Sequence, residues 1–575
     1  MKTRKSFPVV EGEAGHALVV VLIFLVVGLL VLSSSLGWLS TNVRLIDRNN
    51  RYFSAVAAAE AATEKVVAHM SADYQRGGAG EVTLRTAAYR RMVPWEGEAE
   101  EWADFEFHDR SGNAGQIEVE QVTPWGLSGL ISQYSGLAGY ASTYRVVGVA
   151  REAGLENPVA AAVQQELQIA TIPLFQFAIF YNIDLEVNPG PVMDVNGRVH
   201  SNVDLYTSPG GTLNFLGDVT AAGNVYHYRK ENGGLPGGTI VYHGEHDSGV
   251  NTLNLPLGVE NTPENVRQII QPPPVGESSG SALGQQRYYN KADLVITVRD
   301  SGVEVRGGAL RAGWVTLPAS EVSAFMKTNV TFFNKREGKR VQATEIDVAK
   351  LKQWSEAGNA LTAVLGRDVS SVYVTDARTQ SWDTQPGVRL VNGQELPSMG
   401  LTVATAQPLY VQGNYNAPAS ALGTHETRDA KPAALIADAI TVLSGSWRDS
   451  SSTLSLSNRR ASNTTVNAAF LSGIVPTEGS SYSGGVENFP RFLEDWGGRK
   501  LTYNGSMIVL FPSEVATAPW RGTGNTYGIY NPPARDWAFD LNFLDPARLP
   551  PGTPEVRAVI RGGWSMVSAS DGEEH

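Results

Sequence analysis

The stretch GHALVVVLIFLVVGLLVLSSSLG, residues 15–37, decides how the rest of the chain is organised. Between Ala17 and Leu36 no side chain carries a charge, and most are Val, Leu, Ile or Phe. Twenty helical residues, at about 1.5 Å of rise each, make a rod of roughly 30 Å, which is the thickness of a bilayer's hydrocarbon core. The sequence therefore predicts a membrane-spanning helix near the N-terminus.

The helical pattern continues beyond this apolar run. Leu39, Val43, Ile46 and Phe53 follow at helical spacing, and the Ala-rich segment AVAAAEAATEKVVAHM, residues 55–70, has high helix propensity. RGGAG, residues 76–80, then places three glycines together and breaks the pattern. We expect one helix over 16–75, half apolar and half amphipathic.

Two simpler interpretations of this region remain open. A cleaved secretory signal has a shorter apolar region and ends at a small-residue site, which SSSLGWLS matches poorly. A plain membrane anchor would need only the apolar run. Basic residues flank the run on both sides, so the positive-inside rule does not set its orientation: Lys2, Arg4 and Lys5 precede it, and Arg44, Arg48 and Arg51 follow it.

Composition describes a large folded chain rather than a disordered one. Of 575 residues, 42% are hydrophobic and 18% charged, and the 59 glycines and 30 prolines indicate many turns and a β-rich body. The net charge of −12 argues against nucleic acid as a partner. With no cysteine, an exported body must be stabilised by burial rather than by disulfides.

The N-terminal region resembles the type IV pilin and pseudopilin superfamily, and within it the PilX-like minor pilins. The resemblance rests on three segments: the basic leader ending at Gly15, the start HALVVVLIF, and AAEAATEK at 58–65. The resemblance implies a leader over 1–15, cut by a prepilin peptidase between Gly15 and His16. It also implies insertion in the cytoplasmic membrane, with the C-terminal body in the periplasm or on the cell surface, and packing against other pilin or pseudopilin subunits.

One position departs from the family pattern. Most pilins carry a glutamate at the fifth mature position, where this chain has Val20. The resemblance then favours a K-type minor pseudopilin, a tip or initiating subunit, with Val20 and Phe24 in the filament-packing helix. The simpler interpretation is that Val20 is one more apolar residue facing lipid.

Residues 76–172 predict a small α/β head. ADFEFHD (103–109) and QIEVEQV (116–122) alternate with a period of two, and YRVVGVAREAG (144–154) with AAAVQQELQIATI (160–172) predicts a hairpin. By resemblance, such a sheet packs against the second half of a pilin helix.

Residues 173–260 form a first β-rich block of strands only four to six residues long. VMDVNGRVHSN, LNFLGDVTAAG and, more loosely, VYHGEHDSGVN share a form in which an apolar strand meets a glycine-containing turn. Recurrence at roughly 20 residues favours stacked coils of a parallel β-solenoid. A sandwich of hairpins at the Asn-Gly turns is the alternative.

The remaining chain divides into three parts. Residues 261–360 predict a linker and an α/β insertion, with a hairpin at 292–307 turning at Ser301-Gly302 and a helix over 345–357. Residues 361–567 return to short strands and form a second β-rich block with aromatic wrapping segments, and 568–575 is a polar tail. The expected fold class is α+β, mostly β.

Few residues point to chemistry. No phosphate-binding loop or nucleophile motif occurs, and His243-Gly244-Glu245-His246 lacks the helical zinc-binding spacing. Carboxylate and amide oxygens could hold Ca²⁺, although a structural ladder explains them equally: Asp194, Asn196, Asn202 and Asp204. Charged residues could imitate a polysaccharide lyase, but solvated pairs are the simpler interpretation: Asp347, Asp376, Arg336 and Arg378.

The last 130 residues are rich in aromatic side chains. Trp496, Trp520 and Trp537 are the candidate ligand-binding rings, because exposed aromatic rings stack on sugars. Long irregular segments anchored in the core by aromatics are the alternative.

We therefore expect a minor pilin or pseudopilin-like subunit that displays a β-rich adhesive or binding body, with surface glycans as a possible ligand. We expect no enzymatic activity, no catalytic residue, no metal and no cofactor. The alternative is a membrane-anchored surface protein or a glycan-active β-solenoid enzyme that uses 17–36 as a tether.

Overall fold

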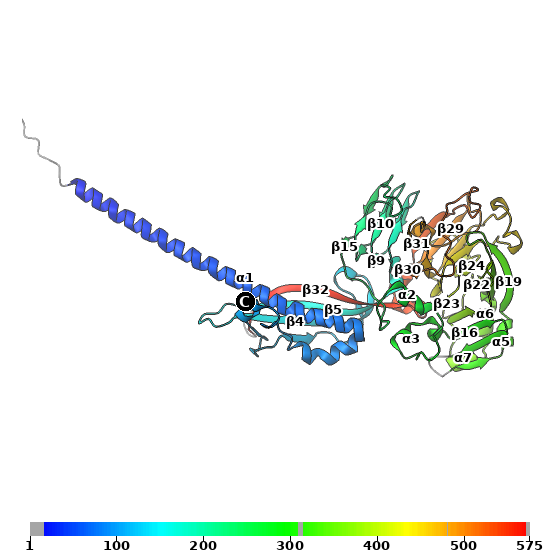
Figure 1. Cartoon of the computed structure of the whole chain (residues 1–575), viewed down its shortest axis with the longest axis horizontal. Helices are drawn as coiled ribbons and strands as arrows, with labels where there is room; N and C mark the ends of the chain where they lie inside the picture. Colours follow the sequence, from blue (N-terminus) through cyan, green and yellow to red (C-terminus); the bar gives the residue numbers. More distant parts are fainter. Residues whose placement is uncertain (1–15, 309–313, 480, 571–575) are drawn as a thin grey trace, which may run out of the picture.

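The computed structural model describes residues 16–308, 314–479 and 481–570. It shows an elongated molecule with three parts in line: a projecting helix, a small sheet beside the second half of that helix, and a large body of short strands (Figure 1). The expected α+β class, with a long N-terminal apolar helix followed by a large β-rich body, is confirmed.

Helix α1 runs from His16 to Tyr89 and is longer than predicted. Its backbone leaves helical geometry at Gly78 (φ 73°) and then resumes. Only glycine adopts this left-handed conformation without strain. The predicted break at 76–80 is therefore a kink within the helix. Arg557 stabilises this region by donating to the carbonyl oxygens of Tyr74 (3.1 Å) and Gln75 (2.6 Å), just before the kink.

The head contains a six-stranded antiparallel sheet centred on β4 (Ala138–Glu152) and β5 (Ala160–Pro173). These two strands form the predicted hairpin. The other strands are β1 (Phe105–His108), β2 (Glu118–Gln121), β3 (Gly126–Gly129) and β32 (Glu555–Val567). Short 3-10 turns accompany them at Glu100–Asp104 and Ser132–Tyr134.

Strand β32 belongs to the head and not to the second β-rich block in which its residues were predicted. It pairs with β5 from Glu555 opposite Pro173 to Val567 opposite Ala162. In an antiparallel pair the end of one strand lies beside the start of the other. The body therefore leaves the head at the end of β5 and returns beside that point. The predicted head boundaries of 76–172 omit this strand.

The first β-rich block consists of three sheets whose paired strands are parallel. Ile179, Val199 and Val219 lie on neighbouring strands, as do Leu185, Leu205 and Val225. The first sheet holds β6 (Ile179–Tyr181), β9 (Val199–Ser201), β12 (Val219–Ala221) and β15 (His246–Ser248). The second holds β7 (Leu185–Val187), β10 (Leu205–Thr207) and β13 (Val225–Tyr226), and the third holds β8 (Met193–Val195), β11 (Leu213–Phe215) and β14 (Ile240–Tyr242).

This pairing repeats every twenty residues through β12. It brings apolar residues of successive twenty-residue repeats into one core, where Leu205, Leu213 and Val219 are fully buried. A sandwich of hairpins would instead pair these strands antiparallel. The solenoid stays a prediction, and the parallel register supports it.

The second β-rich block also has three sheets. One holds β21 (Ser371–Asp376), β23 (Leu401–Thr405), β25 (Ala433–Ala437), β28 (Ala469–Ile474) and β30 (Met507–Pro512). Another holds β19 (Met326–Asn334), β20 (Lys339–Asp347), β22 (Thr384–Val391), β24 (Leu409–Gln412) and β26 (Ile440–Leu443). The third holds β27 (Thr464–Asn467), β29 (Lys500–Gly505) and β31 (Ala534–Phe539).

The two blocks join through their sheets. Strand β30, near the end of the body, pairs in parallel with β6 at its beginning, so that both blocks contribute to one 12-stranded sheet. The chain thus enters and leaves the body at the same level, next to the head.

Residues predicted as an insertion largely extend this body. Strand β16 (Leu294–Arg299) pairs with β21, and β20 pairs with β22, both in parallel. The hairpin of β16 and β17 (Gly302–Gly307) pairs Arg299 with Gly302, so its turn residues are Asp300-Ser301 rather than Ser301-Gly302. Strand β18 is Val315–Leu317, and the helices are α2 (Pro263–Arg267), α3 (Ala282–Gln286), α4 (Tyr288–Lys291), α5 (Ala319–Ser323), α6 (Val348–Glu356) and α7 (Ala360–Leu365).

Candidate assembly site

The first half of α1 projects from the molecule (Figure 1). Its apolar side chains are exposed. Val20 is 48% exposed and Phe24 is 71% exposed. By length and composition the helix can cross a membrane, since its most apolar window has a mean hydropathy of 3.1 and none of it is buried. Large exposed hydrophobic residues continue along it: Leu18, Val19, Val21, Leu22, Ile23, Leu25, Val26, Val27, Leu29, Leu30, Val31, Leu32, Leu36, Trp38, Leu39, Val43, Leu45, Ile46 and Phe53.

Burial begins at Ala55. From there, residues at helical spacing face the head sheet and are almost fully buried: Ala55, Ala58, Ala59, Ala62, Val66, Val67 and Met70. The alanines let the helix come close to β4, where a β-carbon added at Gly148 would lie 2.8 Å from the Ala59 carbonyl oxygen. The helix therefore divides at about residue 54 into a packed half and an uncovered half.

Ion pairs fasten the helix at the border between these halves. Arg51 Nε donates to Glu152 Oε1 at 2.8 Å, and the second nitrogen of its guanidinium reaches the other carboxylate oxygen and the Asn157 carbonyl. Further along the helix, both terminal guanidinium nitrogens of Arg561 in β32 donate to the Glu64 carboxylate. Gln165 donates to the same carboxylate at 2.8 Å. The hydrogen bond from Arg561 holds the pKa of Glu64 below its usual value.

The exposed half has a clear physical requirement. Burying one Val, Leu, Ile or Phe side chain stabilises by about 1.5–3 kcal/mol relative to leaving it in water. A contiguous apolar surface of this extent is a site of contact with lipid or with other protein chains. Val20 and Phe24, predicted for filament packing, both lie in it. Of the predicted cleavage pair, Gly15 lies outside the described residues, and His16 is the first residue of α1.

The predicted ligand-binding aromatics do not form one exposed face. Trp496 is fully buried and packs edge-on against Phe492, with ring centroids 5.6 Å apart. Its ring has no face free for a sugar, so its assignment was wrong. Trp520 is half-buried, where its indole N–H donates to the Tyr530 hydroxyl at 3.0 Å and its ring packs against Tyr482.

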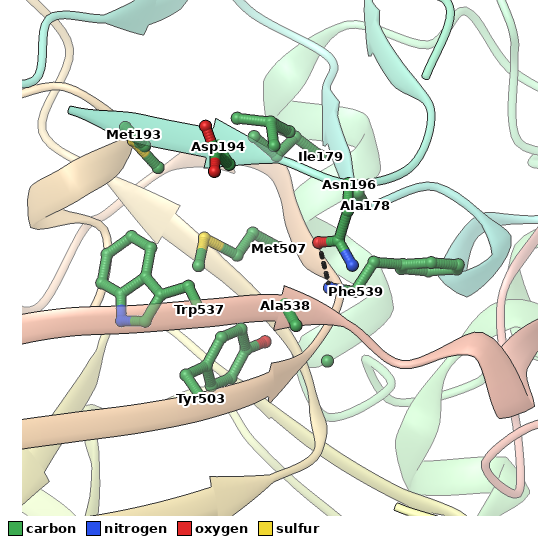
Figure 2. A pocket seen from close by; sticks show the side chains of 12 residues that line it. Ala178, Ile179, Met193, Asp194, Asn196, Tyr503, Met507, Trp537, Ala538 and Phe539 are labelled. Atoms are coloured by element: carbon green, nitrogen blue, oxygen red, sulfur yellow. Dashed lines mark hydrogen bonds between the residues drawn. The ribbon is translucent and has the colours of Figure 1, made fainter. Parts of the chain in front are cut away.

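Trp537 lines a small cavity between β8 and β31, where the two blocks meet. Figure 2 shows it facing Met193 and Met507, with Tyr503 on the neighbouring strand. The cavity measures about 30 Å³. About 10–15 Å³ on this measure holds one water, so the cavity has room for two or three waters. At its edge Asn196 Oδ1 accepts from the Phe539 amide at 2.8 Å, which ties the blocks together.

The other candidate residues make structural contacts. His200 is fully buried between Thr220 (2.8 Å) and Asn202 (2.9 Å), and burial lowers its pKa to about 4. Asp194 accepts from Asn214 on the paired strand β11 at 2.6 Å. Among the residues that the structure describes, no three His, Cys, Asp or Glu side chains lie together as metal ligands.

The charged residues considered for a lyase do not converge. Asp376 and Arg378 pair with each other, Asp347 caps α6 by accepting from the Lys350 amide, and Arg336 donates to the Ala518 carbonyl. They hold different parts of the body.

The sequence did not single out Arg51, Glu152 or Gly148, although each positions the helix. A signal for Gly148 was present, because a glycine inside the apolar strand YRVVGVAR marks a close backbone approach. No comparable signal marks the Arg51–Glu152 pair, since its members lie far apart in the sequence.

Comparisons with known proteins place the chain in no family. No family model matches it, and no curated protein does. Among solved structures, the chain is matched to the crystal structure of the competence-associated pilin ComZ from Thermus thermophilus. The identity is 12%, the match covers 90% of this chain and 97% of that chain, and the TM-score is 0.27. A score this low does not establish a common fold.

Proposed function

We propose that the protein is a pilin-like structural subunit: a minor pilin or pseudopilin of a type IV pilus or a type II secretion-like filament. The observation that carries this proposal is the division of α1 at about residue 54, where a helix held by its own head becomes an apolar rod that nothing in the described chain covers. The resemblance of HALVVVLIF and AAEAATEK to minor pilins gives the same function.

The physical mechanism is assembly without catalysis. Before assembly, lipid of the cytoplasmic membrane covers residues 17–36; in the filament, equivalent helices of other subunits replace the lipid. Val20 and Phe24 lie in this interface. Cleavage after Gly15 by a prepilin peptidase places His16 at the mature N-terminus, and the valine at the fifth mature position suits a subunit at the filament tip.

The body is the displayed part. The parallel strands of the first block, which repeat every twenty residues through β12, support a β-solenoid that stacks outward from the head. Since β5 and β32 are neighbours in the head sheet, two strands hold the body instead of one flexible linker. An adhesive or glycan-binding role fits such a display, although Trp496 takes no part in it.

Photo-cross-linking in the native host tests the assembly role. A benzophenone amino acid replaces Phe24 in one variant and, as a matched control, Trp382 of the body, which is 89% exposed. The proposal expects protein adducts with pilin-like subunits from Phe24 and none of these from Trp382. A simple tether, or an anchored enzyme, would give no subunit adduct at either position and would overturn the proposal.

A further inference from the structure

A buried cluster of oxygen atoms joins the two β-rich blocks at a place that the assembly role does not use. Glu186 lies in β7, and Asn188 follows two residues later. Because successive side chains in an extended chain point to opposite faces, these two point to the same face. Residues of the second block contact them: Thr477, Tyr482, Ser483 and Glu487, the last in the 3-10 turn Val486–Asn488. All three principal side chains are withdrawn from solvent: Glu186 and Asn188 are 4% exposed and Glu487 is 7% exposed.

Short contacts hold the cluster in place. The hydroxyls of Thr477 and Ser483 both donate to Glu186 Oε1, the latter at 2.8 Å. The Asn188 amide N–H donates to Glu487 Oε2 at 3.3 Å, and Asn188 Nδ2 donates to the Tyr482 hydroxyl at 3.2 Å. These contacts bring two carboxylates and one side-chain amide together across the junction.

Two acceptor oxygens in the cluster have no partner. Glu186 Oε2 and Asn188 Oδ1 are both buried, and neither accepts a hydrogen bond from the described chain. Buried acceptors are satisfied in most native structures, and an exception calls for a water or an ion. Asn188 Oδ1 is a neutral group, so its lack of a partner is independent of the two acids.

The two carboxylates also lack a cation. Within residues 16–308, 314–479 and 481–570, no Lys, Arg or His side chain forms an ion pair with Glu186 or Glu487. The basic groups nearby are engaged elsewhere: Lys230 pairs with Asp184, and Arg535 donates to the Glu487 main-chain carbonyl and to Asn488 Oδ1. Against the larger effect of burial, Lys230 lowers the pKa of Glu186 and Arg535 that of Glu487 only through longer-range attraction, and buried carboxylates without a contacting cation are costly to ionise.

We propose that Glu186, Asn188 and Glu487 bind a Ca²⁺ ion that links β7 of the first block to the 3-10 turn Val486–Asn488 of the second. Carboxylate and amide oxygens are the ligands that hard divalent cations prefer, and two carboxylates balance the charge of one such ion. Ca²⁺ fits better than Mg²⁺, because it accepts irregular ligand geometry whereas Mg²⁺ demands an octahedron and keeps its waters.

An entry path exists. A cavity of about 480 Å³ reaches the cluster at Glu186 and Thr477, and its other acidic lining residues are Asp184, Glu264 and Glu478. Acidic walls attract a divalent ion and leave room for coordinating waters.

The effect of burial on the pKa values of the two carboxyls agrees with this proposal. Burial raises the pKa of Glu487 to about 7, and it also raises the pKa of Glu186 above its usual value. Because Ca²⁺ requires the ionised carboxylates, its binding releases protons and strengthens as pH rises.

Terbium luminescence of the full-length chain in detergent, stripped of metal with a chelator, tests the site. Tb³⁺ substitutes for Ca²⁺, and Tyr482, with Trp520 against its ring, can sensitise its emission. The expected result is Tb³⁺ emission on aromatic excitation that Ca²⁺ quenches by competition, together with a Ca²⁺-dependent rise in melting temperature. Glu186→Gln and Glu487→Gln should abolish both, whereas Glu478→Gln, an exposed acid of the same cavity, should keep both.

The wild-type chain alone can overturn the proposal. If Tb³⁺ emission is absent and Ca²⁺ leaves the melting temperature unchanged, the two carboxyls are simply protonated in the fold. Emission that survives in both Gln variants would place the ion elsewhere and equally refute the assignment. None of these results depends on whether the protein assembles into a filament.

Discussion

Arg51 of α1 and Glu152 at the end of β4 form a two-armed ion pair where the helix leaves the head. The pair lies just before the first buried helical residue, so it fixes the direction in which the uncovered half projects. The hydrogen bond from Arg51 also lowers the pKa of Glu152. The carboxylate in turn accepts from the Val159 amide at 2.9 Å and thereby braces the β4–β5 turn.

We expect Arg51→Gln to make α1 more mobile at the point where it leaves the head, without unfolding the head. Hydrogen exchange should accelerate for helical amides near residues 50–60, while exchange in β5 stays slow. Arg48→Gln, at an exposed position one turn earlier, is the control. Equal exchange in the Arg51 variant and the wild type would show that the pair does not position the helix.

Gly148 should tolerate no side chain. In Gly148→Ala the new β-carbon would lie 2.8 Å from the Ala59 carbonyl and 3.2 Å from the Thr63 methyl group, so the helix must move away from β4. We expect a loss of about 1–3 kcal/mol in the free energy of unfolding, as for overpacked cores. Denaturant unfolding measures it, with Gly129→Ala, where a β-carbon meets open space, as the control. A variant as stable as this control would contradict the close approach.

The repeat of the first block predicts which deletions fold. Removing residues 199–218 takes out one whole coil and brings Val219 to the position of Val199 beside Ile179. We expect a folded, less stable protein with parallel pairing retained. Removing 199–217 instead shifts every following side chain to the opposite face and should prevent folding of the block. Circular dichroism and limited proteolysis compare the two; equal outcomes would argue against stacked coils.

A buried carboxyl predicts how stability depends on pH. Glu494 is fully buried and accepts from the amide and hydroxyl of Ser444, and burial raises its pKa to about 7. In the unfolded chain this carboxyl ionises near its ordinary pKa of 4.5, so between pH 4.5 and about pH 7 the folded state binds the extra proton. Stability therefore falls as pH rises through this window, by up to ~1.4 kcal/mol per pH unit for one group, and falls no further above it.

Glu494→Gln should remove this group's part of the slope. In urea unfolding, we expect the free energy of unfolding of the variant to rise relative to that of the wild type between about pH 5 and about pH 8, by on the order of 1–3 kcal/mol. Glu426→Gln, at an exposed residue that pairs only with Arg428, should leave the slope unchanged. A variant whose slope equals that of the wild type would mean that Glu494 ionises normally in the fold.

Local sequence patterns predicted the local structure well. The apolar run predicted the exposed half of α1, the strand patterns at 144–154 and 160–172 predicted the β4–β5 hairpin, and the helix predicted over 345–357 corresponds to α6. Each of these depends on residues that are near one another in the chain.

Partners distant in sequence could not be predicted in the same way. Nothing in the residues 555–567 distinguishes a strand of the head from another strand of the body, and the pairing of β30 with β6 has no local signature either. Burial of Trp496 follows from those distant contacts, so its spacing among other aromatics could not reveal it. The oxygen cluster of Glu186 and Glu487 likewise forms only when the two blocks meet.

The mature N-terminus tests the central claim most directly. The protein is purified from membranes of a host that has a prepilin peptidase. Its intact mass and N-terminal sequence then identify the first residue of the mature chain. Our account expects the chain to begin at His16 with the whole apolar helix retained, and Gly15→Phe to leave the leader attached. A wild-type chain that begins at Met1, or one that begins beyond Gly37 with the helix removed, would contradict it.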